Sequence, residues 1–70
     1  MSVDRKLLIL QQLATGPKKI QELIDKTKIP QTSIYRIVGK LVSEGSVERM
    51  MGRMALTTEG RMRYTGQLEN

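Results

Sequence analysis

Glu22 and Asp25 are the two carboxylates whose spacing comes closest to that of an acid–base pair on one helix. Such a pair transfers protons only where a pocket shifts its proton affinities, and we interpret these side chains as part of a solvated helix face. The sequence has no cysteine and no histidine, which excludes disulfides, thiolate or imidazole metal sites, cysteine nucleophiles and histidine acid–base chemistry. We therefore expect a protein that is not an enzyme and that has no metal site and no cofactor.

Basic residues outnumber acidic ones. Twelve Lys and Arg against seven Asp and Glu give the 70-residue chain a formal charge of +5, which favours polyanionic partners on so small a body. Nucleic acid is the first candidate and a membrane surface is the rival. The longest apolar run, residues 7–10, is far shorter than the roughly 20 residues that span a bilayer. The first four residues lack the apolar segment of a signal peptide, so we expect a cytoplasmic protein.

Apolar periodicity predicts two helices in the first half of the chain. The first covers about residues 3–14 and ends at Gly16 and Pro17, because glycine permits a left-handed cap and proline cannot continue a helix. The second covers about residues 19–27 and ends before Pro30. A chain of this length has enough apolar surface for one modest core, so we expect a single domain over residues 1–70.

The second half predicts a third helix, a hairpin and a last helix. Pro30 suits a first helical turn, and apolar residues recur on one helix face from Ile34 to Val42 in a helix that stops at Gly45. Residues 47–57 then fit a short two-stranded hairpin that turns at residues 51 and 52. Thr57 or Thr58 can cap a helix that ends near Gly66. The predicted fold class is therefore mainly α with a small β hairpin (α+β).

Residues 28–49, KIPQTSIYRIVGKLVSEGSVER, resemble the second half of a winged helix-turn-helix DNA-binding domain. They are especially similar to the IclR-type pattern Ile/Leu-Pro-x-x-Ser/Thr-aliphatic-Tyr/His-Arg, which opens the recognition helix. Leu41, Gly45 and Val47 match the Leu-x-x-x-Gly-x-Val pattern that closes it. Residues 9–17 resemble the usual first helix with its Gly-Pro exit, and residues 56–61 resemble the Leu-Thr-x-x-Gly segment that follows the wing in MarR-like and PadR-like proteins.

This resemblance implies a three-helix winged helix-turn-helix with a short two-stranded wing and a C-terminal helix. It also implies a sequence-specific transcriptional regulator of double-stranded DNA. Its recognition helix, about residues 31–44, would lie in the major groove, and its wing, about residues 47–57, on the backbone or in the minor groove. The match departs from the family at Lys19, where Thr or Ser usually caps the second helix, and at Met50 and Met51 in a very short wing. No effector domain follows, so no small-molecule effector is expected.

The helix over residues 31–44 has two distinct faces. At about 100° per residue, one side gathers the residues expected in the core, Ile34, Ile37, Val38, Leu41 and Val42. The other side carries Thr32, Ser33, Arg36, Gly39, Lys40 and Ser43. This second face is small, hydroxylated and basic and holds no acidic residue, so it can approach a phosphate-lined groove without repulsion.

Individual residues of this helix have candidate roles. Arg36 can donate two hydrogen bonds to the O6 and N7 atoms of one guanine, and a phosphate contact is nearly as well supported. Lys40 is expected to contact the DNA backbone, and Tyr35 lies at the border, where core packing and DNA contact are equally compatible with its position. Three residues at the helix N-terminal end can reach base edges or phosphates, namely Gln31, Thr32 and Ser33.

Four basic residues outside this helix complete the predicted interface. Lys18 and Lys19 precede the second helix, whose N-terminal N–H groups favour a phosphate; solvated lysines are the alternative. Arg49 and Arg53 flank the hairpin turn and resemble wing arginines that follow the backbone or enter the minor groove. Either arginine could instead pair with Glu48.

Two further hypotheses concern partners. Leu8 falls among polar residues on the first helix, and Tyr64 and Leu68 form an apolar strip on the last, so we expect a homodimer through these three residues. The alternative function is a protein–protein interaction module in a larger assembly, because this fold serves that role as well. Such a module would more often expose apolar residues on the helix face that is basic here.

Overall fold

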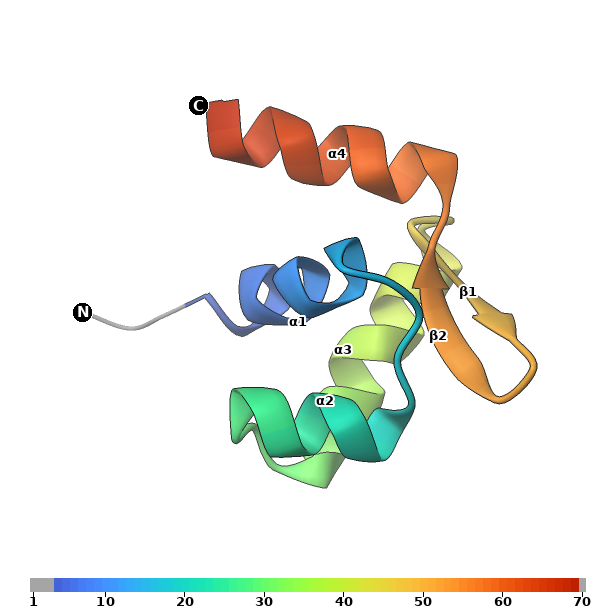
Figure 1. Cartoon of the computed structure of the whole chain (residues 1–70). Helices are drawn as coiled ribbons and strands as arrows, with labels where there is room; N and C mark the ends of the chain where they lie inside the picture. The colour runs from blue at the N-terminus through green and yellow to red at the C-terminus, as the bar shows by residue number, and fades with distance from the viewer. Residues whose placement is uncertain (1–3, 70) are drawn as a thin grey trace.

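The computed structural model describes residues 4–69, with side chains as far as residue 66, and shows four helices and one antiparallel hairpin in this range (Figure 1). The elements are α1 (Arg5–Ala14), α2 (Ile20–Thr27), α3 (Gln31–Ser43), β1 (Val47–Met50), β2 (Arg53–Leu56) and α4 (Thr58–Glu69). The mainly α fold with a small hairpin is therefore confirmed. The residue at which the first helix was predicted to begin, residue 3, lies outside the described residues.

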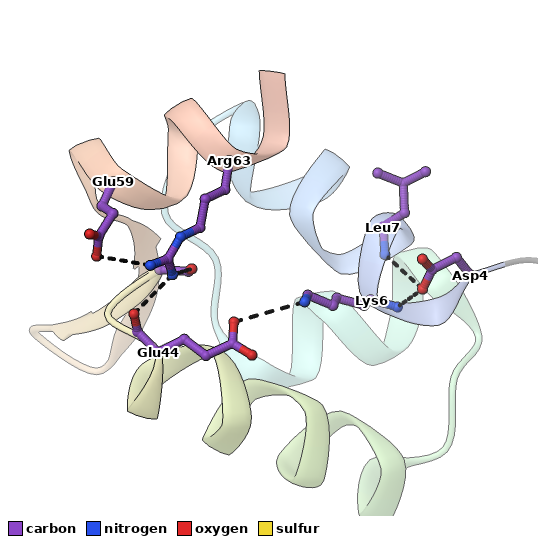
Figure 2. A network of polar contacts seen from close by, with 7 residues as sticks. Asp4, Lys6, Leu7, Glu44, Glu59 and Arg63 are labelled. Carbon is purple, nitrogen blue, oxygen red and sulfur yellow. Dashed lines mark hydrogen bonds and ion pairs between the residues drawn. The ribbon is translucent and has the colours of Figure 1, made fainter. Parts of the chain in front are cut away.

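The N-terminus of α1 is capped by its own sequence. The Asp4 carboxylate accepts hydrogen bonds from the backbone N–H groups of Lys6 and Leu7, at 3.0 and 3.4 Å (Figure 2). A carboxylate there satisfies donors that have no partner inside the helix and faces the positive end of the helix dipole. The helix ends at Thr15, and Gly16 has a φ of +136°.

A tight turn joins α2 to α3. Lys28 has a φ of +62°, a left-handed conformation that ends α2. The Thr27 hydroxyl accepts a hydrogen bond from the Ile29 N–H at 3.3 Å, and the Ile29 side chain is buried. We had predicted Pro30 in the first turn of α3, but it is the N-cap residue just before that turn. Glu44 is the C-cap residue just beyond the last turn.

The hairpin that forms the wing turns over two residues. Val47 pairs with Leu56 and Met50 with Arg53, which leaves Met51 and Gly52 as the loop. Their φ angles of +50° and +81° have the signs of a type I′ turn, the turn whose twist suits two paired strands. A further backbone bridge joins Lys18 to Met54, so the segment before α2 extends this small sheet on its other edge.

The core lies between α1, α2, α3 and the hairpin. Its fully buried residues are Ile9, Leu10, Leu13, Leu23, Ile34, Leu41 and Val47. From α3, Val38 is also buried and Ile37 is partly buried against this cluster. Val42, which we had expected in the core, is exposed at its edge.

Leu8 departs from the sequence-based expectation that it points away from the core. Its side chain is half-buried and packs against the core cluster, and so does Tyr64 of α4. The reason is that α1 lies between α4 on one side and the α2–α3 pair on the other (Figure 1), so it is covered on two faces. We had predicted that Leu8 points away from the core because we assumed that α1 is covered only along its main apolar stripe. The side chain of Leu68 lies outside the described residues.

Helix α4 is joined firmly to the end of α3. The Thr57 hydroxyl accepts from the Gly60 N–H at 2.9 Å, which confirms Thr57 as the cap of α4, and donates to the Gly45 carbonyl at 2.6 Å. The Arg63 guanidinium donates to the Glu44 carbonyl at 2.9 Å and to the buried Ser46 hydroxyl at 2.8 Å (Figure 2). A Cβ on Gly60 would press against the Ser46 carbonyl group, so only glycine permits this close approach.

Candidate DNA-binding interface

The exposed face of α3 has the composition predicted for it. Gln31, Thr32, Tyr35, Arg36 and Lys40 are exposed, whereas Ile34, Val38 and Leu41 are buried. Thr32, Arg36 and Lys40 lie opposite the buried side, and Gln31 and Tyr35 lie at its border. Because the buried residues recur every three to four positions, the polar residues between them are held in one orientation. The helix therefore presents two cations, an amide, a hydroxyl and a phenol side by side.

Ser33 lies at the border of this face and contacts the first helix. It is half-buried, and its hydroxyl accepts a hydrogen bond from Arg5 Nη1 at 3.2 Å. A hydroxyl that accepts one bond can still donate its own proton to a second acceptor. The contact therefore leaves Ser33 able to reach DNA and places the Arg5 guanidinium beside the N-terminal end of α3.

Lys6 brings a second unpredicted cation to the same flank of α3. With Arg36 and Lys40 it lines a pocket of about 140 Å³ between α1 and α3. The Glu44 carboxylate also lines this pocket, where its Oε2 lies 3.8 Å from Lys6 Nζ (Figure 2). The sequence-based interpretation missed Arg5 and Lys6 because it assigned α1 to the core and to a dimer interface and not to the DNA-binding surface, although both basic residues stand together in its first turn.

Lys18 and Lys19 differ in their surroundings. The Lys18 ammonium is folded back over the end of α1, where it donates to the Thr15 hydroxyl at 2.9 Å and to the Gly16 carbonyl at 3.3 Å. Lys19 is exposed and is the N-cap residue of α2. Its backbone N–H donates to the Glu22 carboxylate at 3.1 Å, which forms one half of a capping box, since a lysine side chain has no acceptor for the other half.

The two wing arginines, both exposed, take different faces of the hairpin. Arg49 pairs with Met54 and Arg53 pairs with Met50, and directly paired residues in an antiparallel ladder share a face while successive residues alternate. Arg49 therefore shares the face of the buried Met54 and lines a pocket of about 290 Å³ against α3. The ion pairs found among the described residues involve neither arginine and leave Glu48 out as well.

The two carboxylates of α2 both accept hydrogen bonds from their own helix or its cap. Glu22 serves the α2 cap, and Asp25 accepts a hydrogen bond from Gln21 at 3.1 Å, so each carboxylate has a role in the helix. Within the described residues, no three His, Cys, Asp or Glu side chains gather where they could hold a metal ion. The described helices also include none that is long and apolar enough to cross a membrane.

Comparison with known proteins relates the chain to transcriptional regulators. Residues 8–65 match the family model described as "Sugar-specific transcriptional regulator TrmB". The sequence matches none of the curated proteins with which it was compared.

Solved structures share the fold. Ligand-free NadR superposes with a TM-score of 0.85 at 28% sequence identity, over 96% of this chain and 52% of that one. A MarR/EmrR family transcriptional regulator from Acinetobacter sp. ADP1 gives 0.82 at 20% identity, over 91% and 48%. The transcriptional regulator Tm0710 from Thermotoga maritima gives 0.77 at 20% identity, over 96% and 57%. The chain thus spans about half the length of these structures.

Proposed function

The chain belongs to the TrmB family of sugar-specific transcriptional regulators, and we propose that it regulates transcription by binding duplex DNA with α3 in the major groove. In this arrangement the hairpin lies on the adjacent backbone or in the minor groove. The proposed contacts from α3 are Gln31, Thr32, Ser33, Tyr35, Arg36 and Lys40. Those from the other elements are Lys18, Lys19, Arg49 and Arg53, to which we add Arg5 and Lys6.

The observation that carries this proposal is the charge pattern around α3. Its exposed face holds no carboxylate, and the one acidic residue at its end, Glu44, lies against the Lys6 ammonium. Cations flank the helix on both sides, Arg5 and Lys6 from α1 and Arg49 from the hairpin. Such an arrangement matches the two phosphate strands that border a major groove.

The assembly-module alternative is less well supported by the exposed apolar residues. The most exposed large ones are Met51 at the hairpin tip and Met62 on α4, at 98% and 69%. These two residues lie on different elements, whereas an interaction surface needs a contiguous apolar patch. The proposed function is DNA binding, which needs no catalytic group. We propose that the protein acts in the cytoplasm, where it meets its DNA.

The test is binding to duplex DNA across a salt series. We expect the logarithm of the association constant to fall linearly with the logarithm of salt concentration, because phosphate contacts release counterions. Lys40→Ala should weaken binding, while Arg61→Ala, which removes the same charge from an exposed position of α4 outside the proposed interface, should not. Absence of wild-type binding at low salt would contradict the proposal and favour the assembly module.

We further propose that the protein binds DNA as a homodimer through α1 and the C-terminal segment. Paired domains of this type contact half-sites about 34 Å apart. Leu8 and Tyr64 are partly covered within one chain, so their substitution would also disturb the core. Met62→Glu changes an exposed residue of α4 and is the better probe. It should shift the particle to monomer mass in light scattering, and a wild-type protein that is monomeric at high micromolar concentration would contradict the dimer.

A further inference from the structure

Gly39 is a glycine that the interior of the fold does not need. It lies within α3, where glycine destabilises the helix relative to alanine. A Cβ built on it meets no atom within 4 Å. Gly60 in α4 is different, because a Cβ there would lie 2.7 Å from the Ser46 carbonyl carbon. Packing among the described residues therefore does not require a glycine at this position or at Gly66; what distinguishes Gly39 is the pocket that it borders.

Gly39 borders the pocket between α3 and the hairpin, which has a volume of about 290 Å³. The pocket is lined by Ile20 from α2, by Tyr35, Val38 and Gly39 from α3 and by Arg49, Gly52 and Met54 from the hairpin. Its walls combine apolar groups with one cation and one phenol, and no carboxylate lines it. It lies where the major-groove helix and the wing meet, so it continues the proposed DNA interface.

We propose that this pocket holds the sugar–phosphate backbone of the DNA strand that separates the two grooves. A helix in the major groove and a hairpin at the next minor groove must lie on either side of that strand. In the pocket, the missing side chain of Gly39 makes room for a deoxyribose, whose C–H groups suit the apolar walls. The Arg49 guanidinium then binds the adjacent phosphate with charge-assisted hydrogen bonds.

This assignment rests on the proposed function and predicts opposite effects on stability and binding. Gly39→Ala should raise the melting temperature by about 2–8 °C, because an alanine in a helix loses less backbone conformational entropy on folding than a glycine does. The same change should lower the affinity for duplex DNA. Gly39→Leu fills more of the pocket and should lower that affinity by roughly tenfold or more, the scale of an overpacked site.

The matched control is Gly66→Ala in α4. Gly66 is also a helix glycine whose Cβ would meet no atom within 4 Å. This variant should gain stability like Gly39→Ala and bind DNA like the wild type. Arg49→Gln should weaken binding as the position 39 variants do. The losses at both positions should be equal on a selected site and on random duplex, since a backbone contact carries no sequence information.

The outcomes separate this inference from the proposed function. If the wild type binds DNA and Gly39→Leu binds as tightly while remaining folded, the pocket does not hold DNA and the inference is overturned. A loss confined to the selected site would assign Gly39 to a base contact and overturn the backbone assignment. If the wild type itself binds no duplex at low salt, the proposed function fails and this inference fails with it.

Discussion

The backbones of Lys18 and Met54 exchange two hydrogen bonds, from the Lys18 N–H to the Met54 carbonyl at 2.9 Å and from the Met54 N–H to the Lys18 carbonyl at 2.7 Å. This pairing holds the segment between α1 and α2 against β2. It also fixes the direction in which the neighbouring residue, Lys19, leaves the sheet to begin α2. The two adjacent lysines therefore differ: Lys18 is half-buried and bonded within the protein, and Lys19 is exposed.

We predict that Lys19→Ala weakens binding to all duplex sequences and lowers the slope of the salt dependence by about one, as expected for one lost phosphate contact. Lys18→Ala should change the slope less and lower the stability by about 0.5–1.5 kcal/mol, because the Lys18 ammonium donates two hydrogen bonds within the protein. Salt titrations of binding together with urea unfolding measure both effects. Equal slopes for the wild type and Lys19→Ala would place Lys19 in solvent.

Arg36→Ala should reduce discrimination between a selected site and random duplex. A bidentate contact to guanine contributes about 1–3 kcal/mol of discrimination against the wrong base, and Arg36 is exposed on the face of α3 that we place in the groove. Lys40→Ala is the matched variant on the same face and should weaken both kinds of duplex alike. Competition binding gives the two ratios, and equal losses for Arg36→Ala would make Arg36 a phosphate contact.

Gly60→Ala should destabilise the protein by about 1–3 kcal/mol or more, the cost of forcing atoms into a packed site. The added Cβ would lie 2.9 Å from Ser46 Cα and against its carbonyl, and backbone atoms cannot move aside as a flexible side chain can. Gly66→Ala adds the same methyl group to the same helix where it meets nothing, and should stabilise by about 0.5–1 kcal/mol. Similar unfolding midpoints for the two variants would contradict the close approach.

Met51→Asn should stabilise the hairpin by about 0.5–1 kcal/mol. Met51 has a φ of +50° at the first position of the loop, where asparagine before glycine is the preferred pair and most side chains are strained. Met51→Val places a β-branched residue at the same position and should lower the stability. Thermal unfolding of the two variants measures the difference, and a valine variant as stable as the asparagine variant would show that the turn is not left-handed.

The helices, the hairpin and the face of α3 were predictable because their signals are local. Thr57 precedes the helix that it caps, and the two-residue turn at Met51 and Gly52 follows from the glycine. Asp4, which we had placed inside the first helix, is its N-cap residue, so the start of that helix was predicted too early. The apolar periodicity of α3 also indicates which of its side chains are buried, with Val42 at the edge of the apolar face as the exception. These features depend on residues within about one helical turn of one another.

Contacts between distant segments were not predictable in the same way. Leu8 is half-buried because α4 packs against α1. The sequence of α1 alone does not indicate that contact. Lys18 pairs with Met54 through a single backbone bridge. A segment this short shows no alternation of apolar and polar residues from which a strand could be predicted. Arg5 reaches Ser33 across 28 positions of sequence, so its place beside the recognition helix emerges only when the helices pack.

In the proposed DNA complex, the joint between α3 and α4 would link the position of α4 to DNA affinity. Three successive carbonyls at the end of α3, those of Glu44, Gly45 and Ser46, accept hydrogen bonds from Arg63 and Thr57. If α4 moved away, the Glu44 carbonyl and the Ser46 hydroxyl would lose Arg63, and Thr57 would lose the Gly60 N–H that it caps, so order at the end of α3 would be coupled to docking of α4. Coupling of this kind is reciprocal: the factor by which docking of α4 raises DNA affinity equals the factor by which bound DNA favours docking. A molecule that binds docked and undocked α4 with different affinities would therefore change the occupancy of DNA without contacting the duplex.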